Sequence, residues 1–281
     1  MLDFWQAALS HPLARNALFA ALLVSLCCGT VGTYVVVRRI SYIAAGVSHC
    51  VLGGLGAACY LNVAWGWTWL KPVHGALFAA LLSASVIGWV SLRRREREDT
   101  AISAVWSVGM AAGILFLYAT PGYSQDLMGY LFGNILLVTN HSLWLLAGLD
   151  AVVILVVWWF FHEFQAVCFD EEFARLRNLN VDAYYILLLT LTALTVVALS
   201  MVVGVVLVIA LLTLPAAMAG RFARSLAQMM VLASLLCAGC CLAGLTISYR
   251  PDLPVGPTII LVAGAGYLIA AVLPRRFFRR G

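Results

Sequence analysis

The sequence predicts an all-α polytopic membrane protein with about nine transmembrane helices. Hydrophobic residues make up 64% of the 281 residues and charged residues only 10%, whereas about 25% of the residues in an ordinary soluble domain are charged. Apolar runs of roughly 20 residues, the length that crosses a bilayer, follow one another along the chain. These runs are unbroken, so they form helices and exclude a β-barrel, whose strands alternate in polarity.

Nine apolar runs are long enough to cross the hydrocarbon, and total counts of eight to ten fit the sequence. In chain order they are residues 16–37, 42–61, 73–92, 100–118, 142–161, 183–201, 203–220, 227–248 and 255–273. The segment 127–139, LMGYLFGNILLVT, is too short and too interrupted by glycine for a complete crossing. We expect it to form a re-entrant half-helix.

Clusters of arginine set the orientation, because loops rich in Arg and Lys stay in the cytoplasm. The clusters are Arg38 with Arg39, the arginines of 93–97, Arg175 with Arg177, Arg221 with Arg224, and the tail RRFFRR. Nine crossings place all five on one side and the N-terminus outside. The net charge of +5 therefore reflects membrane topology, and nothing indicates nucleic-acid binding.

The chain divides into one long domain and two short ends. Residues 1–15 carry Phe4 and Trp5 beside polar positions and lack the basic start of a signal peptide, so we expect them to lie along the membrane surface. Residues 16–273 form a single transmembrane domain, and 274–281 form a basic cytoplasmic tail.

Motifs that would indicate an enzyme are incomplete. HEFQA at 162–166 has Ala166 where a zinc protease needs its second His, and Lys71, the only lysine, lies outside any phosphate-binding loop. The chain is therefore no enzyme and cannot hydrolyse ATP alone. CAGC at 237–240 lies within a span without a second ligand pair, and GMAAG at 109–113 has the G-x-x-x-G spacing, so both predict close helix packing.

One substantial polar loop, residues 162–185, separates two predicted spans on the cytoplasmic side. Its acidic FDEEF precedes ARLRNLN, the charge order that complements the dipole of a short helix, which we expect at about residues 169–181. As a simple connector the loop would leave Phe169 and Phe173, which share a helix face, exposed without purpose.

Four motifs in this order carry a family resemblance: RRISYIAAGVSH, DLMGYLFGNIL, FDEEFARLRNLNV and GVVLVIALLTLPAAMA. Over roughly residues 16–273 the chain resembles the membrane permease subunit of bacterial ABC importers for zinc, manganese or chelated iron. The resemblance implies a dimer in the bacterial plasma (inner) membrane, formed with a second copy or a paralogue. It also implies two copies of a cytoplasmic ATPase and an extracytoplasmic metal-binding protein. ATP and Mg²⁺ then belong to the ATPase, this chain holds no cofactor, and a divalent transition metal is its substrate.

The resemblance gives the polar loop a role, because in such permeases the corresponding short helix seats in a groove of the ATPase. Its apolar anchors would be Phe169, Phe173 and Leu179, and its charged rim Asp170, Glu171, Glu172, Arg175 and Arg177. Aromatic anchors within a polar rim are typical of protein interfaces. The loop is therefore interpreted as a coupling helix.

His49 lies near the middle of an apolar run, where an ionisable side chain needs a function or a partner. In the family it resembles, an Asp commonly stands four residues earlier and shares the metal, but here Ala45 takes that position. Two His49 side chains in a dimer would favour zinc or iron(II) over manganese, whereas Cys50 points about 100° away around the helix. The alternative is a neutral His49 hydrogen-bonded to a neighbouring helix.

Two further residues are candidates for the mouth or gate of a translocation pathway. Asp126 precedes the re-entrant segment on the outer side, where it could equally cap that helix. Pro215 interrupts the backbone hydrogen bonding of its span, which serves either gating or packing.

The sequence is also compatible with two other classes of transporter. A permease for a metal chelate, such as a siderophore or haem, would share the architecture with a wider path. A secondary transporter would need intramembrane carboxylates for ion coupling. Asp150 is the only acidic residue well inside a predicted span, which disfavours that second class.

Overall fold

The computed structural model describes residues 12–93, 98–121, 131–133, 135–249, 251 and 253–272, and within these ranges it is helical without strands. Three predicted features fall wholly or mostly outside the described residues: the N-terminal segment 1–15 up to residue 11, Asp126, and the basic tail 274–281. Of the expected re-entrant segment 127–139, residues 127–130 and 134 also lie outside.

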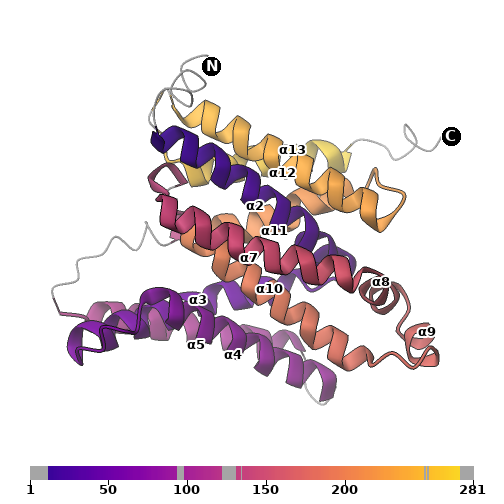
Figure 1. Cartoon of the computed structure of the whole chain (residues 1–281), viewed down its shortest axis with the longest axis horizontal. Coiled ribbons are helices and arrows are strands. Elements are labelled where there is room, and N and C mark those ends of the chain that lie inside the picture. The colour runs from indigo at the N-terminus through magenta and orange to yellow at the C-terminus, as the bar shows by residue number, and fades with distance from the viewer. Residues whose placement is uncertain are drawn as a thin grey trace.

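Each of the nine predicted spans coincides with a helix (Figure 1). The long helices are α2 (Pro12–Val37), α3 (Ser41–Ala64), α4 (Pro72–Arg93), α5 (Glu98–Ala119), α7 (Asn140–Trp159), α10 (Val181–Val203), α12 (Leu226–Tyr249) and α13 (Val255–Val272). The shorter elements are η1 (Ile135–Leu137), α8 (Phe161–Phe169), α9 (Glu171–Leu176) and α11 (Val205–Ala219). Among the described residues, eight helices are long and apolar enough to cross a membrane, which confirms the predicted multi-pass architecture.

The seventh predicted span is shorter than expected. Helix α11 has 15 residues and is therefore about 22 Å long, less than the roughly 30 Å of the hydrocarbon core. It begins after Gly204, whose φ of 81° ends α10 in a conformation that favours glycine. The predicted boundary between the spans 183–201 and 203–220 lies within two residues of this break, but α11 ends up too short for a complete crossing.

The backbone of residues 131–133 packs directly against this break. A Cβ on Gly204 would overlap the backbone of Phe132 and Gly133, and a Cβ on Gly133, whose φ is 61°, would overlap Val203 and Gly204. A Cβ on Gly256 at the start of α13 would meet the carbonyl of Phe132. The described end of the 127–139 segment is thus wedged between α10, α11 and α13.

Helices α2, α3 and α10 are the most buried of the long helices, and α5, α7 and α13 the least. In Figure 1, α3, α4 and α5 form one group, while α11, α12 and α13 gather on the other side of α10. Helix α2 packs on both α11 and α12. Apolar side chains of α2, α3, α4, α10, α11 and α12 meet in one continuous core cluster, which includes Tyr34, Val47 and Leu211.

Glycines bring α3 into backbone contact with its neighbours. Cβ atoms on Gly53 and Gly56 would overlap the carbonyls of Gly109 and Gly113 in α5, which confirms the packing predicted from GMAAG. On α4, Gly75 lies so close to Gly54 that a Cβ on either would meet the carbonyl of the other. Small residues allow this approach between helices in lipid, where packing and not water exclusion drives association.

The described arginine clusters gather at one end of the bundle, which we call the basic end. Arg38 contacts Glu171, the end of α4 reaches α10 through Ser91 and Tyr185, and Arg221 donates to the carbonyl of Ala271 over 3.1 Å. Val36 and Val37 at the end of α2 also pack against the cluster formed by the end of α11 and the start of α12. This arrangement agrees with the predicted clustering of these loops on one side of the membrane.

We expect Gly54→Ala to destabilise the purified protein in detergent, because the new methyl would overlap the carbonyl of Gly75 and push α3 away from α4. Overpacking of this kind costs about 1–3 kcal/mol. Thermal unfolding followed by circular dichroism measures the effect. The matched control is Gly148→Ala in α7, where a Cβ meets nothing within 4 Å and helix propensity favours alanine. Equal unfolding temperatures for the two variants would contradict the glycine contact.

Candidate functional site

Helix α9 is a short, well-capped helix between α8 and α10 at the basic end (Figure 1). Asp170 adopts an extended conformation that separates α8 from α9, and its carboxylate accepts a hydrogen bond of 2.9 Å from the amide of Phe173. Glu171 and Glu172 occupy the first turn and Arg175 the last, so these charges complement the helix dipole. The helix is shorter than the predicted 169–181, because Asp170 breaks it at the start and a turn follows Leu176.

The turn after α9 returns the chain inward. Asn178 has a φ of 59°, and the amide of Leu179 donates to the carbonyl of Ala174 over 3.1 Å. Leu179 then packs on a small cluster with Val167 and Val181. A carboxamide cap at Asn180 begins α10, so both ends of the α9 segment are fixed by local hydrogen bonds.

Three large apolar side chains around α9 are exposed. The exposed fractions are 65% for Phe169, 50% for Phe173 and 83% for Leu176. Phe169 and Phe173 agree with the exposure expected of apolar anchors, whereas Leu179, the third predicted anchor, is half-buried. Leu176 was not predicted, although its spacing of three residues from Phe173 places both on one helix face.

The charged residues of the predicted rim differ in their environments. Glu172 and Arg177 are exposed, and the guanidinium of Arg177 lies 5.8 Å from the Phe173 ring centroid. Arg175 pairs with Asp182 at 2.9 Å, with both side chains about half exposed. Glu171 instead points inward and forms an ion pair with Arg38.

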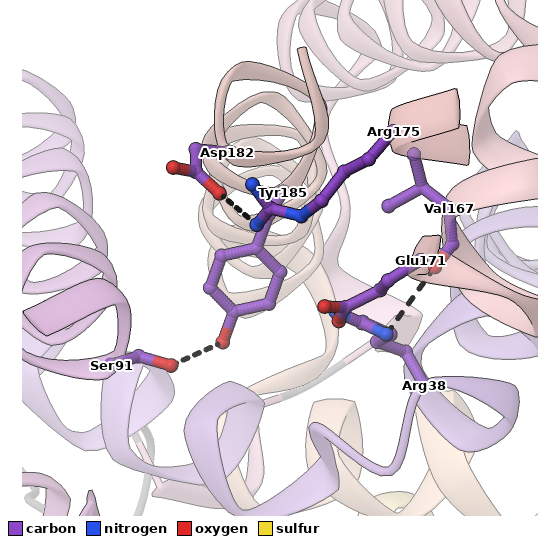
Figure 2. A network of polar contacts seen from close by, with 7 residues as sticks. All are labelled: Arg38, Ser91, Val167, Glu171, Arg175, Asp182 and Tyr185. Atoms are coloured by element: carbon purple, nitrogen blue, oxygen red, sulfur yellow. Dashed lines mark hydrogen bonds and ion pairs between the residues drawn. The ribbon is translucent and has the colours of Figure 1, made fainter. Parts of the chain in front are cut away.

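Figure 2 shows the polar network that surrounds Arg38 at the basic end. Besides contacting Glu171, Arg38 donates to the carbonyl of Val167 over 3.3 Å, and its guanidinium lies 5.5 Å from the Tyr185 ring centroid. The hydroxyls of Tyr185 and Ser91 are 3.1 Å apart. The network therefore joins the ends of α2, α4, α8, α9 and α10.

A cavity of about 760 Å³ lies beside this network. Its lining comes from the α2–α3 turn, α3, α4, α5, α9 and α10, and it carries charges of both signs, among them Arg39, Asp99 and Glu172. Tyr42 and Ile43 at the start of α3 also face it. The start of α3 and the start of α9 thus border one polar space.

His49 lies on α3 with its ring stacked on Trp106 of α5. The ring centroids are 4.5 Å apart and the planes differ by 6°. Its Nδ1 is buried, and no described residue hydrogen-bonds to it. The π contact holds this imidazole, and the alternative of a hydrogen bond from a neighbouring helix to Nδ1 finds no partner in the described part of the chain.

The residues next to His49 are occupied by backbone contacts. Ser48 donates to the carbonyl of Ala44 over 2.8 Å, and the Cys50 thiol lies 3.1 Å from the carbonyl of Val105. Ala45, one turn before His49, is buried. Within the described ranges, no three His, Cys, Asp or Glu side chains gather as metal ligands.

Two residues inside the membrane-spanning helices were noted from the sequence. Pro215 is buried within α11, which continues past it to Ala219. Asp150 on α7 is 2% exposed, and neither of its carboxylate oxygens has a hydrogen-bond partner among the described residues. Asp126, the other candidate for the pathway mouth, lies outside the described residues.

Sequence reasoning missed Arg38, Tyr185 and Trp106 as members of these sites. The charge of Arg38 was noted in the sequence, but it was used only to assign its loop to the cytoplasmic side. Tyr185 and Trp106 stand within apolar runs, and only the packing of α10 and α5 shows which polar group each one meets.

Comparison with known proteins identifies the family of this chain. The family model described as "ABC 3 transport family" matches residues 10–273. The "Probable metal transport system membrane protein" of Chlamydia trachomatis is 38% identical over 270 residues, which cover 96% of this chain and 92% of that protein. The "Manganese import system permease protein ScaB" of Streptococcus gordonii is 30% identical over 280 residues, which cover 99% of this chain and 98% of the relative.

A solved structure shares the fold. PsaBC from Streptococcus pneumoniae, determined in complex with a Fab, superposes with a TM-score of 0.86 at 31% identity and covers 99% of this chain and 98% of its own. Nearly the whole chain therefore matches in sequence and in the arrangement of its helices, and the protein is a multi-pass membrane protein that belongs to the ABC 3 transport family.

Proposed function

We propose that this chain is the permease subunit of an ATP-driven importer that passes a divalent transition metal, manganese, zinc or iron, into the cytoplasm. Membership of the ABC 3 transport family supports an importer, and the metal-transport names of relatives support the substrate class. The metal is received from an extracytoplasmic binding protein. The basic end faces the cytoplasm, as its arginines favour.

The observation that carries the proposal is the exposed apolar surface formed by Phe169 at the end of α8 and by Phe173 and Leu176 of α9. The break at Asp170 places Phe169 and Phe173 on separate helices and not on one helix face as predicted, but exposed apolar side chains grouped outside the membrane are typical of a binding surface. The exposed charges of Glu172, Arg175 and Arg177 surround them, as in an interface with a polar rim.

In this proposal α9 docks on an ATPase subunit, which supplies the ATP hydrolysis that this chain lacks the motifs to perform. A symmetric complex of two permeases and two ATPases presents two α9 helices to two nucleotide-binding subunits. ATP and Mg²⁺ bind to those partners. Nucleotide-driven movement of the ATPases then moves α9 relative to the membrane helices.

The passing cation contacts His49 in this proposal. The stack on Trp106 fixes the ring and buries Nδ1, while the residue keeps partial exposure, so Nε2 is the nitrogen available to a cation. Each chain contributes one neutral imidazole and no carboxylate at Ala45, and two chains contribute two. Sparse coordination of this kind binds weakly, which suits a protein that must release its cargo.

Replacing Phe173 by Asp should abolish association with the ATPase of the importer while leaving the permease in the membrane. The substitution removes a buried apolar anchor and places a charge at the centre of an apolar interface. Such anchors contribute about 2 kcal/mol or more to the free energy of binding. Co-purification through a tag on the permease measures association. Phe173→Leu is the matched control, since it keeps an apolar side chain and should retain the ATPase. Stoichiometric capture by the Asp variant would rule out α9 as the docking helix.

Replacing His49 by Ala should lower uptake of radioactive manganese and zinc by cells that lack other importers. The expected loss is about tenfold or more, since even residues that only orient metal ligands contribute on that scale. His141→Ala, at an exposed position of α7, is the control and should transport normally. Expression and ATPase capture should not change in either variant.

The companion variant Ala45→Asp separates a metal contact from a structural role. If His49 faces the cation, a carboxylate one turn away adds charge compensation and tightens binding of Mn²⁺ or Zn²⁺, measured by isothermal titration on the purified complex. If His49 serves packing alone, Ala45→Asp lowers the unfolding temperature without adding affinity. Full uptake by His49→Ala would remove His49 from the pathway.

A further inference from the structure

Arg38 occupies the point where the membrane helices meet the α9 segment. It follows the last residue of α2, and only 20% of its side chain is exposed. Its guanidinium binds Glu171, the first residue of α9, and the carbonyl of Val167 in α8 (Figure 2). One side chain therefore contacts the helices on both sides of the break at Asp170.

The ion pair with Glu171 differs from the other described ion pair of this region. The side chains of Arg38 and Glu171 are 20% and 31% exposed, whereas those of Arg175 and Asp182 are 55% and 50% exposed. Exposed pairs contribute little because water and salt screen them. A shielded pair is costly to break, because each partner would be left with a poorly solvated charge.

The chain beyond Arg38 leads directly to the start of α3. Arg39 adopts a φ of 60°, and the amide of Ile40 donates to the carbonyl of Val35 over 2.9 Å, so residues 38–40 form a tight turn. Helix α3 begins at Ser41 and carries His49. His49 lies eight residues after Ser41, a distance of about 12 Å along the helix. A displacement of Arg38 is thus passed through a short, hydrogen-bonded turn to a rigid helix.

The cavity beside Arg38 leaves room for such a displacement. Arg38, Glu171, Tyr42 and Ile43 all line its volume of about 760 Å³. When α9 moves toward or away from this cavity, Glu171 moves with it and shifts the guanidinium of Arg38. Energetic coupling requires an element with two discrete arrangements that both sites bias, and the cavity lined by the ion pair gives it room for a second arrangement.

We propose that the Arg38–Glu171 ion pair is the link through which movement of α9 reaches α3, and with it His49. The inference rests on the proposed function, in which α9 docks on the ATPase and His49 contacts the cation. Arg38 is a positioning residue here, because its side chain is mostly shielded and contacts Glu171 and the carbonyl of Val167. Glu171 faces the permease interior in this role, rather than the rim that meets the ATPase.

The test compares Arg38→Gln with Arg39→Gln in the complete complex of permease and ATPase, reconstituted in proteoliposomes with the binding protein and Mn²⁺. The two variants remove the same charge from adjacent residues, but within the described residues Arg39 makes no ion pair. ATPase capture, ATP hydrolysis and Mn²⁺ uptake are measured on the same preparations. Thermal unfolding of each variant shows whether it is folded.

Arg38→Gln should keep the ATPase bound and ATP hydrolysis within about twofold of the parent, while Mn²⁺ uptake per ATP falls about tenfold, in the range typical of coupling between two sites. Arg39→Gln should match the parent in all three measurements. The charge-reversed pair Arg38→Glu with Glu171→Arg should recover uptake to within about threefold, whereas each single reversal should not.

Three results would overturn the inference: normal uptake per ATP by Arg38→Gln, no recovery in the folded charge-reversed pair, or loss of ATPase capture by Arg38→Gln, which would assign Arg38 to docking. Failure of the proposed function gives a different pattern. In that case the parent protein itself neither captures the ATPase nor transports Mn²⁺.

Discussion

The contact of α3 with its neighbours through glycine backbones is the constraint on which the interior depends. Inside a membrane the hydrophobic effect does not draw helices together, so specificity comes from how closely their surfaces fit. Gly53, Gly54 and Gly56 place one turn of α3 against carbonyls of α4 and α5. The same approach brings Trp106 of α5 onto the ring of His49. The orientation of the imidazole therefore depends on the packing of α3 against α5.

Much of the fold could be predicted from the sequence, because hydropathy and arginine placement are strong signals in a membrane protein. Each of the nine apolar runs forms a helix, and the glycines of GMAAG lie in a close contact between α3 and α5, as predicted. The break between α10 and α11 was predicted within two residues of Gly204, but α11 is shorter than the predicted span 203–220. Only the close packing of residues 131–133 shows why the chain turns at this glycine.

The candidate sites were predictable in part, for a physical reason that differs between them. Acidic and basic residues in helix order revealed α9, but the left-handed turn at Asn178 directs Leu179 inward and leaves Leu176 as the exposed apolar residue. Asn directly after a helix is a local signal for such a turn, and the predicted helix 169–181 did not use it. Arg38 and Glu171 lie 133 residues apart, so their pairing depends on the tertiary arrangement of α2 and α9.

The unequal shielding of the two ion pairs at the basic end has a consequence for ionic strength. Dissolved salt screens charges in contact with water over a Debye length of about 8 Å at physiological concentration, and shields buried pairs much less. Arg175, Arg177 and Glu172 lie in the exposed class, and Arg38 with Glu171 in the shielded one. Added salt should therefore weaken the proposed docking of an ATPase on α9 more than it weakens the Arg38–Glu171 ion pair. Ionic strength thus offers a way to vary the proposed docking of the ATPase on α9 separately from the proposed coupling through Arg38 and Glu171, without changing a residue.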